Sequence, residues 1–245
     1  TLFNEPLIAL QVGHRFTSIT GVVGYSFGNY EVNATQAIGF EATELKQEVT
    51  SLLATDNRLT LASYNVLNLS GDSSDDGQRQ QLARQIVDHL KSPDIIALQE
   101  IQDDSGEKND GVVTADQTLK RLTQAIEAVA GPRYEAFNVA PRDGNDGGVP
   151  GGNIRNAFLF KPDRVELVDY MALSPEVLKI QGCSDPNAFE GSRTPLQATL
   201  KFSGHELTDV NNHLSSRYGS SPVSGALQPF DQGGSRGRDS QTRCL

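Results

Sequence analysis

Cysteine and basic residues are scarce in this chain, and each scarcity argues against one class of protein. Only two of the 245 residues are cysteines, Cys183 and Cys244, and no CxxC pair occurs. Two cysteines do not define a disulfide framework, so their pairing stays open, and the low count suits secreted and cytosolic proteins alike. Basic residues are also few, because 21 Lys and Arg face 31 Asp and Glu, for a formal net charge of −10. This balance argues against a protein that coats nucleic acid through basic stripes.

Long apolar runs are absent as well. No segment reaches the length of a membrane span, and no signal peptide opens the sequence. The first residue is Thr1 rather than methionine, so we expect the chain to begin inside a longer protein. Hydrophobic residues still make up 37% of the chain, which is enough for the core of one large domain.

The first 40 residues predict a small β structure. Short strands are expected at 16–25 and 30–33, and Gly28-Asn29 supplies a turn between them. This stretch is too short to bury a core of its own, so residues 1–40 are interpreted as the C-terminal part of a small β domain. Residues 41–57 carry mixed charge without a strong period and are predicted to be a linker.

From residue 58 onward, strands and helices alternate and then strands follow one another. Apolar residues recur at helical spacing in two segments, one centred on Ile86 and the other on Leu122. Strands are predicted at 58–67, 94–99, 134–139, 153–160, 165–170, 195–202 and 206–211. This order predicts a layered α/β domain over residues 58–245.

Polar residues end three of these apolar strands. Glu100 directly follows the run Ile95–Leu98, Asn65 lies late in the first strand, and His213 follows Val210-Asn211-Asn212. A charge at the mouth of a buried strand is costly unless it is paired, and a metal ion is a common partner. Taken singly, each residue is more often an ordinary rim or turn residue, and Arg193 alone could simply be exposed.

The order of the motifs resembles the endonuclease/exonuclease/phosphatase superfamily, to which pancreatic deoxyribonuclease belongs. The matching stretches are Ala62–Asn68, Pro93–Ile101, Gly151–Val165, Ser192–Pro195 and Val210–Arg217. Within the superfamily the chain looks closest to large extracellular bacterial nucleases, which often carry small β modules, some OB-like, before the catalytic domain. The resemblance implies a four-layered, deoxyribonuclease I-like α/β sandwich, here incomplete.

The resemblance also implies a role for each strand-end residue. Glu100 matches the family's metal-binding glutamate, a ligand for Mg²⁺ or Mn²⁺, and Asn65 matches the asparagine beside that metal. His213 matches the histidine that contacts the scissile phosphate, and Arg193 stands where deoxyribonucleases place a phosphate-contacting arginine. The implied function is hydrolysis of a phosphodiester in DNA or RNA by in-line attack of water. Nucleic acid is then the partner, and no protein partner is indicated.

The chain departs from the family pattern in two places. No tyrosine precedes the strand at Asn153, and Arg155 is interpreted either as a replacement phosphate contact or as an exposed strand arginine. The family's Gly-Asp-Phe-Asn and Ser-Asp-His motifs do not occur before Leu245. We therefore expect a C-terminally truncated chain with an incomplete active site, poorly stable and catalytically silent or nearly so.

Several alternatives stay open. The parent enzyme could be a phosphatase or a sphingomyelinase of the same superfamily, and the chain itself a pseudo-enzyme or binding fragment. Ca²⁺ is weakly indicated, because Asp72-x-Ser74-x-Asp76-Gly77 and Asp143-x-Asn145 open like calcium loops but lack the final glutamate. Secretion from a bacterium is the expected localisation, on the resemblance alone.

Overall fold

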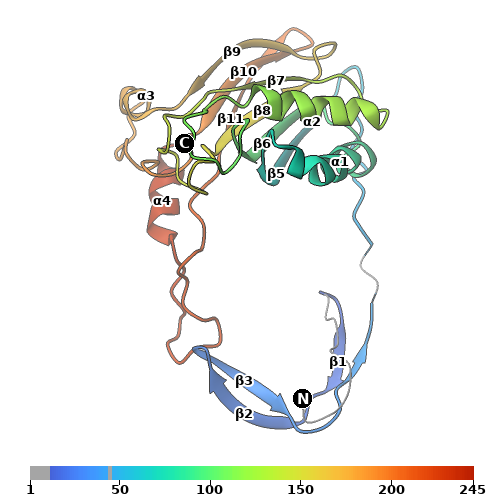
Figure 1. Ribbon diagram of the computed structural model, residues 1–245, viewed down its shortest axis with the longest axis vertical. Helices are drawn as coiled ribbons and strands as arrows, with labels where there is room; N and C mark the ends of the chain where they lie inside the picture. The colour runs from blue at the N-terminus through green and yellow to red at the C-terminus, as the bar shows by residue number, and fades with distance from the viewer. Residues whose placement is uncertain (1–11, 44–45) are drawn as a thin grey trace. The chain divides into compact units, whose positions relative to one another are not determined.

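The computed structural model describes residues 12–43 and 46–245. The first eleven residues of the predicted β domain, and residues 44–45 of the predicted linker, lie outside the described part. Contacts divide the chain into two compact units (Figure 1). The N-terminal unit holds the described residues up to Glu48 together with Ser216–Ser235, and the larger unit holds Val49–Ser215 and Arg236–Leu245.

The N-terminal unit is built from four short strands. They are β1 (Arg15–Ser18), β2 (Gly21–Ser26), β3 (Asn29–Ala34) and β4 (Gly39–Glu41). β1 pairs antiparallel with β4, and β2 pairs antiparallel with β3. The turn between β2 and β3 is Phe27-Gly28, and both residues have positive φ, 47° and 79°. Two-residue hairpin loops of this kind match the right-handed twist of the flanking strands.

A distant segment joins this unit. The Tyr30 amide donates to the Ser224 carbonyl at 2.8 Å, and the Ser224 amide donates to Asn29 Oδ1 at 3.3 Å. The sequence does not indicate these contacts. The boundaries at 1–40, 41–57 and 58–245 stay predictions.

Two sheets form the centre of the larger unit. The first has the order β5-β6-β8-β7, with β5 parallel to β6 and the other pairs antiparallel. The second is antiparallel with the order β11-β10-β9. Their strands are β5 (Leu61–Leu69), β6 (Ile95–Ile101), β7 (Glu135–Asn138), β8 (Arg155–Phe160), β9 (Glu166–Ala172), β10 (Leu196–Phe202) and β11 (His205–Asn211). The sequence therefore located all seven, with small shifts at their ends.

Helices cover one face of the first sheet. They are the short 3-10 turn η1 (Ser73–Asp75), α1 (Asp76–Arg84), the π-helical turn η2 (Gln85–His89) and α2 (Asp116–Ala128). Ile96 and Leu98 of β6 pack against Ile86 and against Leu122 and Ile126 of α2. The sequence predicts one continuous helix around Ile86, whereas the structure changes to π-helical geometry at Gln85. Apolar spacing reports a buried face and does not distinguish these two geometries.

The other face of the first sheet packs against the second sheet. Ile95, Ala97 and Phe158 meet Leu196, Ala198 and Leu200 in one buried cluster. Each strand buries alternate residues here, as expected for a sandwich of two sheets.

A partial fourth layer lies on the outer side of β11. Val210 and Leu214 pack with α3 (Pro175–Ile180), Phe189 and the disulfide between Cys183 and Cys244. The disulfide, left open by the sequence, brings the end of α4 (Ser235–Arg243) to this layer. The α/β sandwich class is thus confirmed. Across the described residues no helix is long and apolar enough to cross a bilayer.

Candidate active site

Glu100 lies at an irregularity in the first sheet. The β5–β6 pairing runs to Asn65↔Gln99 and resumes only at Leu69↔Ile101, and the β6–β8 pairing is interrupted at the same place. Glu100 falls in this gap with a φ of 63°. A left-handed backbone at a non-glycine residue costs about 1 kcal/mol or more and tends to persist where function requires it. The bulge therefore marks Glu100 as a functional candidate.

Asn65 holds the Glu100 carboxylate. Its Nδ2 donates to Glu100 Oε1 at 2.7 Å, and its own Oδ1 accepts from the Leu67 amide at 2.9 Å. The amide oxygen of Asn65 is therefore engaged by the backbone of its own strand. In this arrangement Asn65 orients Glu100, whose second carboxylate oxygen has no hydrogen-bond partner in the described part of the chain.

His213 approaches the same carboxylate, and Arg193 is hydrogen-bonded to the backbone at His213. His213 Nε2 lies 3.5 Å from Glu100 Oε1, and Arg193 Nη2 donates to the carbonyls of His213 and Leu214 at 3.1 and 2.9 Å. Burial lowers the pKa of His213, the charge of Arg193 lowers it further, and Glu100 opposes both. The structure thus brings together all four residues that the sequence singled out: Asn65, Glu100, Arg193 and His213.

Two donors of this site have no protein partner. His213 Nδ1 and Arg193 Nε are buried and accept or donate no hydrogen bond within the described residues. Buried polar atoms are normally paired, so each unpaired atom requires an explanation. An anion with several oxygens, such as a phosphodiester, could use both.

A hydrogen-bonded clamp between the sheets fixes this geometry. Gln99 Nε2 donates to Asn211 Oδ1 at 2.7 Å, and Asn211 Nδ2 donates to the carbonyls of Leu98 and Ala157 at 2.8 and 2.9 Å. Both amides are buried. Gln99 precedes Glu100 and Asn211 stands two residues before His213, so the clamp ties one strand end to the other. The clamp was not predicted from the sequence, although a polar residue at an inward position of each strand was a readable signal.

Comparison with known proteins identifies the relatives of this site. Residues 62–229 match the profile of the Endonuclease/Exonuclease/phosphatase family. The chain belongs to this family. Its members are hydrolases of phosphoester bonds, and the resemblance inferred from the sequence is confirmed. No curated protein sequence matches significantly.

Solved structures of the family are similar at low identity. A humanized D. rerio TDP2 is 20% identical, covering 65% of this chain and 49% of its own, with a TM-score of 0.38. A family protein from Leptotrichia buccalis is 14% identical, with 67% and 58% coverage and a TM-score of 0.44. The human Nocturnin catalytic domain is 18% identical, with 58% and 44% coverage and a TM-score of 0.33. The chain spans about half the length of these structures.

Enzymes of this family commonly use a divalent metal ion. Within the described ranges no group of three or more His, Cys, Asp or Glu side chains could hold a metal. Glu100 is the carboxylate at this strand end that could serve as an anionic ligand for a cation. Mg²⁺ is often bound by one or two carboxylates together with water and substrate phosphate, which suits this site, whereas Ca²⁺ prefers six to eight oxygens.

The acidic loops have structural explanations. Asp72 accepts the Ser74 amide at 2.9 Å and pairs with Lys108 at 3.2 Å, and these contacts lower its pKa to about 2. Asp143 accepts a hydrogen bond from Asn153 at 3.1 Å. Because these carboxylates already serve as caps and loop contacts, neither loop adds support for a Ca²⁺ site.

Arg155 corrects one expectation. Its side chain is 2% exposed, so the interpretation as an exposed arginine is wrong. It donates to the carbonyls of Val113 and Asn153 and to Asn138 Oδ1, and burial lowers its pKa to about 10. These contacts give Arg155 a structural role between loops. They could not be read from the sequence because Val113 lies 42 residues away.

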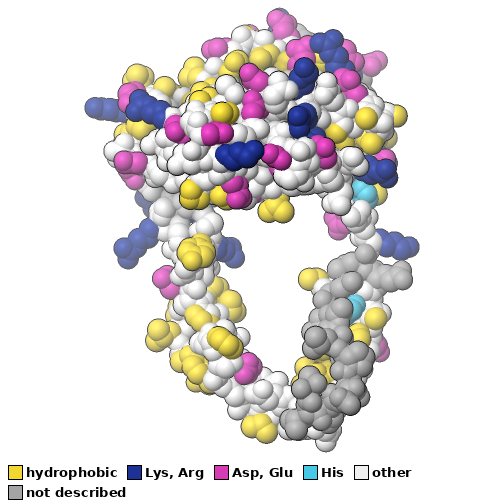
Figure 2. Space-filling model, in the orientation of Figure 1, with side chains coloured by type: hydrophobic (Ala, Val, Ile, Leu, Met, Phe, Trp, Pro, Cys, Tyr) yellow, Lys and Arg dark blue, Asp and Glu magenta, His cyan; other side chains and the backbone are white. Residues whose placement is uncertain are grey.

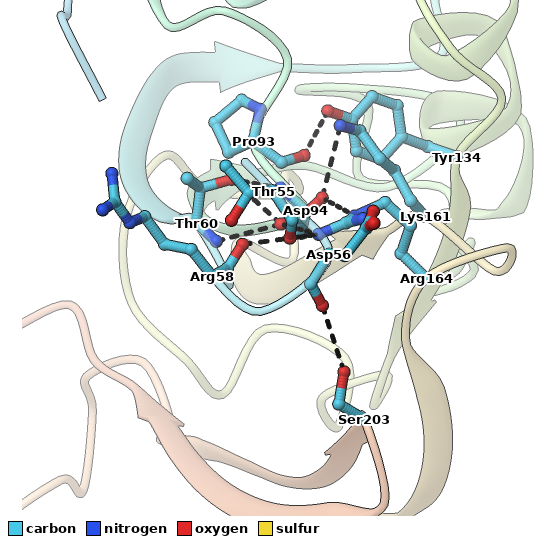
Figure 3. A network of polar contacts seen from close by, with 10 residues as sticks. All are labelled: Thr55, Asp56, Arg58, Thr60, Pro93, Asp94, Tyr134, Lys161, Arg164 and Ser203. Carbon is cyan, nitrogen blue, oxygen red and sulfur yellow. Dashed lines mark hydrogen bonds and ion pairs between the residues drawn. The ribbon is translucent and has the colours of Figure 1, made fainter. Parts of the chain in front are cut away.

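A second buried charge cluster lies at the opposite end of β6 (Figure 3). Asp94 is fully buried and accepts from the Thr60 amide at 3.0 Å, from Arg164 Nε at 2.7 Å and from Lys161 Nζ at 3.4 Å. Burial alone would raise the pKa of Asp94, but the hydrogen bonds from Arg164 and Thr60 and the charge of Lys161 outweigh it, so the pKa is lowered. This satisfied network anchors the start of β6, and its role is structural.

Proposed function

We propose that this chain carries the metal- and phosphate-binding part of a divalent-metal-dependent phosphodiesterase that acts on nucleic acid. One observation carries the proposal: Asn65, Glu100, Arg193 and His213, from four separate segments, meet at one strained strand end. Family membership supports the reaction class. Nucleic acid as the substrate and secretion from a bacterium rest on the sequence resemblance.

Each residue has a distinct part in the proposed reaction. Glu100 would hold Mg²⁺ or Mn²⁺, and Asn65 would keep its carboxylate oriented. A bound divalent cation would supply positive charge against a phosphoryl oxygen. Arg193, through its unpaired Nε, and His213, through its unpaired Nδ1, would hold the non-bridging oxygens as negative charge grows on phosphorus. Because burial lowers the pKa of His213, the imidazole is neutral at neutral pH and donates one hydrogen bond.

The acidic composition is compatible with this proposal. A net charge of −10 disfavours long basic contact surfaces, but an enzyme that grips one or two phosphates through a metal needs only local positive charge. The disulfide between Cys183 and Cys244 supports an oxidising compartment, which is consistent with secretion.

The test combines metal binding with cleavage. The purified chain is titrated with Mn²⁺, observed by electron paramagnetic resonance, and is then assayed with Mg²⁺ or Mn²⁺ on plasmid DNA and RNA. We expect Glu100→Gln to weaken Mn²⁺ binding at least tenfold and to lower any residual phosphodiester cleavage about a hundredfold, because the anionic ligand is lost. Glu107→Gln, an exposed acidic residue in a nearby loop, is the control and should leave both unchanged.

Other outcomes would redirect the assignment. Faster release of phosphate from a phosphomonoester than cleavage of DNA or RNA favours the phosphatase alternative, and selective cleavage of sphingomyelin favours the sphingomyelinase alternative. Mn²⁺ binding without cleavage of any substrate favours the non-catalytic alternative for this chain. Mn²⁺ binding that is unaffected by Glu100→Gln would contradict the proposal itself.

A further inference from the structure

A hollow between α1 and α2 lies apart from the candidate active site. Its volume is about 570 Å³, within the range of small-molecule sites. Arg79, Arg84 and Arg121 line it, with Gln124, Ala125 and Val129 beside them. None of Asn65, Glu100, Arg193 and His213 contributes to it. The helices cover the face of the first sheet that points away from the second sheet.

The hollow is positively charged in an acidic protein. Three arginines line it against one acidic residue, Asp76, and that carboxylate is already paired with Arg79. The side chains of Arg84 and Arg121 form no ion pair or hydrogen bond within residues 12–43 and 46–245. On the face of this unit that Figure 2 shows, Lys and Arg side chains are interspersed with Asp and Glu. Two unpaired guanidinium groups around one hollow therefore favour an anionic ligand.

Arg79 provides an independent reason to expect a ligand. Its side chain is only 4% exposed. Nη2 donates to the carbonyls of Ser70 and Asp72 at 2.8 and 3.1 Å, and Nη1 pairs with Asp76, but Nε has no partner within the described residues. A buried arginine donor left unpaired in the lining of a cavity is a position that a ligand oxygen can satisfy.

We propose that this hollow binds the phosphate of a nucleotide. Guanidinium groups hold phosphate oxygens in pairs, which assigns Arg84 and Arg121 to the phosphate and leaves the Arg79 Nε as a third donor. Ala125 and Val129 offer a small apolar surface for the sugar or base, and the Gln124 amide can donate and accept at its edge. A bare inorganic anion would leave the apolar side and most of the volume unused.

The ligand could be a free nucleotide or the phosphorylated end of a nucleic-acid strand, since both present the same chemistry. This inference does not depend on the proposed function, because no residue is shared between the two sites. A nucleotide held here would contact α1. Arg79 of α1 donates to the carbonyls of Ser70 and Asp72, in the loop that follows β5, and β5 carries Asn65.

The experiment measures binding by isothermal titration calorimetry on the full chain carrying Glu100→Gln, which prevents cleavage. The probes are AMP, a 5′-phosphorylated hexanucleotide and inorganic phosphate at low salt. Arg84→Gln with Arg121→Gln removes two charges while keeping residues of similar helix propensity. Lys120→Gln is the matched control, because Lys120 neighbours Arg121 on α2 but lines a different hollow. A second variant, Ala128→Asp, places a negative charge at the lining instead of removing positive ones.

We expect AMP to bind, and the Arg84→Gln/Arg121→Gln variant to weaken binding at least tenfold, with Lys120→Gln within twofold of the parent. Ala128→Asp should also weaken it at least tenfold, and higher salt should weaken it in the parent. Binding of AMP identifies a free-nucleotide site, and binding of the hexanucleotide alone identifies a strand-end site. Four results would overturn the inference. Lys120→Gln could lose as much affinity as the arginine variant, or neither the arginine variant nor Ala128→Asp could lose any. Inorganic phosphate could bind as tightly as AMP, or no probe could bind at all.

Discussion

Glu100 combines a left-handed backbone with a proposed metal ligand, and the two can be separated by mutation. Glycine adopts a φ of 63° without steric cost, whereas alanine keeps the strain and loses only the carboxylate. We expect Glu100→Gly to have a free energy of unfolding about 1 kcal/mol higher than that of Glu100→Ala. Urea denaturation of both variants measures this difference.

Both Glu100 variants should lose Mn²⁺ binding equally, since neither has a carboxylate. The left-handed backbone at this bulge would then position the Glu100 carboxylate at a cost in stability. Equal stabilities of the glycine and alanine variants would show that the turn is not strained.

Asp94 gives a prediction for the dependence of stability on pH. The pKa of its carboxyl is lowered in the folded state, so it stabilises the fold above the ordinary aspartate pKa. This contribution falls as the pH drops below about 4 and is lost once the pH passes the lowered value. Asp94→Asn should cost about 3 kcal/mol at neutral pH, because Lys161 and Arg164 lose their buried partner.

The difference in unfolding free energy between the parent and Asp94→Asn should therefore shrink as the pH falls below about 4. Urea denaturation at several pH values measures it, and Asp163→Asn, on an exposed turn beside Arg164, serves as the control. A difference that stays constant down to pH 2 would contradict a lowered pKa for Asp94.

Among the elements, β6 and β11 are coupled by the Gln99–Asn211 clamp. Asn211→Ala removes the buried hydrogen bonds to the carbonyls of Leu98 and Ala157, and it removes one bond of the Gln99 amide, which keeps its bonds to Ser63 and Ala97. We expect a loss of about 3 kcal/mol in unfolding free energy. Combined with Gln99→Ala, the double variant should show a coupling of about 1 kcal/mol.

The control for this cycle is Asn212→Ala. Asn212 is the next residue and half-buried, and among the described residues its amide donates only to the carbonyl of Val210, two residues away. It should lose less than about 1 kcal/mol and show no coupling with Gln99→Ala. Strict additivity of Asn211→Ala and Gln99→Ala would mean that the clamp does not join the two sheets.

The elements also show what the sequence could predict. Apolar runs and helical spacing located the strands and the two main helices, because burial imposes these patterns directly. α3 was missed because six residues make no periodic pattern, although Ser174-Pro175 is a readable start signal: the Ser174 hydroxyl caps the Val177 amide. The change to π-helical geometry at Gln85 leaves no such signal.

At the candidate site, residue types and motif order were enough to select Asn65, Glu100, Arg193 and His213. Their mutual contacts were not predictable, because they depend on a bulge and on a hydrogen bond between residues 112 positions apart. Arg155 illustrates the same limit, since its neighbours in sequence do not reveal the distant carbonyl that it binds. Local pattern therefore names candidates, and long-range pairing decides their roles.

For the whole molecule, the disulfide between Cys183 and Cys244 is the largest single covalent constraint. It spans 61 residues, so the chain-entropy model assigns it about 4 kcal/mol. We expect the Cys183→Ser/Cys244→Ser variant to melt at lower temperature, as scanning calorimetry would show. The parent should show the same shift with a reducing agent, and the double variant should not respond to it. An unchanged melting temperature after verified reduction would contradict this contribution.

The same disulfide also bears on how the chain would respond to a protease. The polypeptide leaves the larger unit after Ser215 and re-enters it at Arg236, and the two cysteines lie on opposite sides of that excursion. A single cut within Ser216–Ser235 would therefore leave two polypeptides that remain one covalent particle until a reductant separates them. The longer piece would keep Asn65, Glu100, Arg193 and His213 together, so a nicked molecule would still carry the complete set.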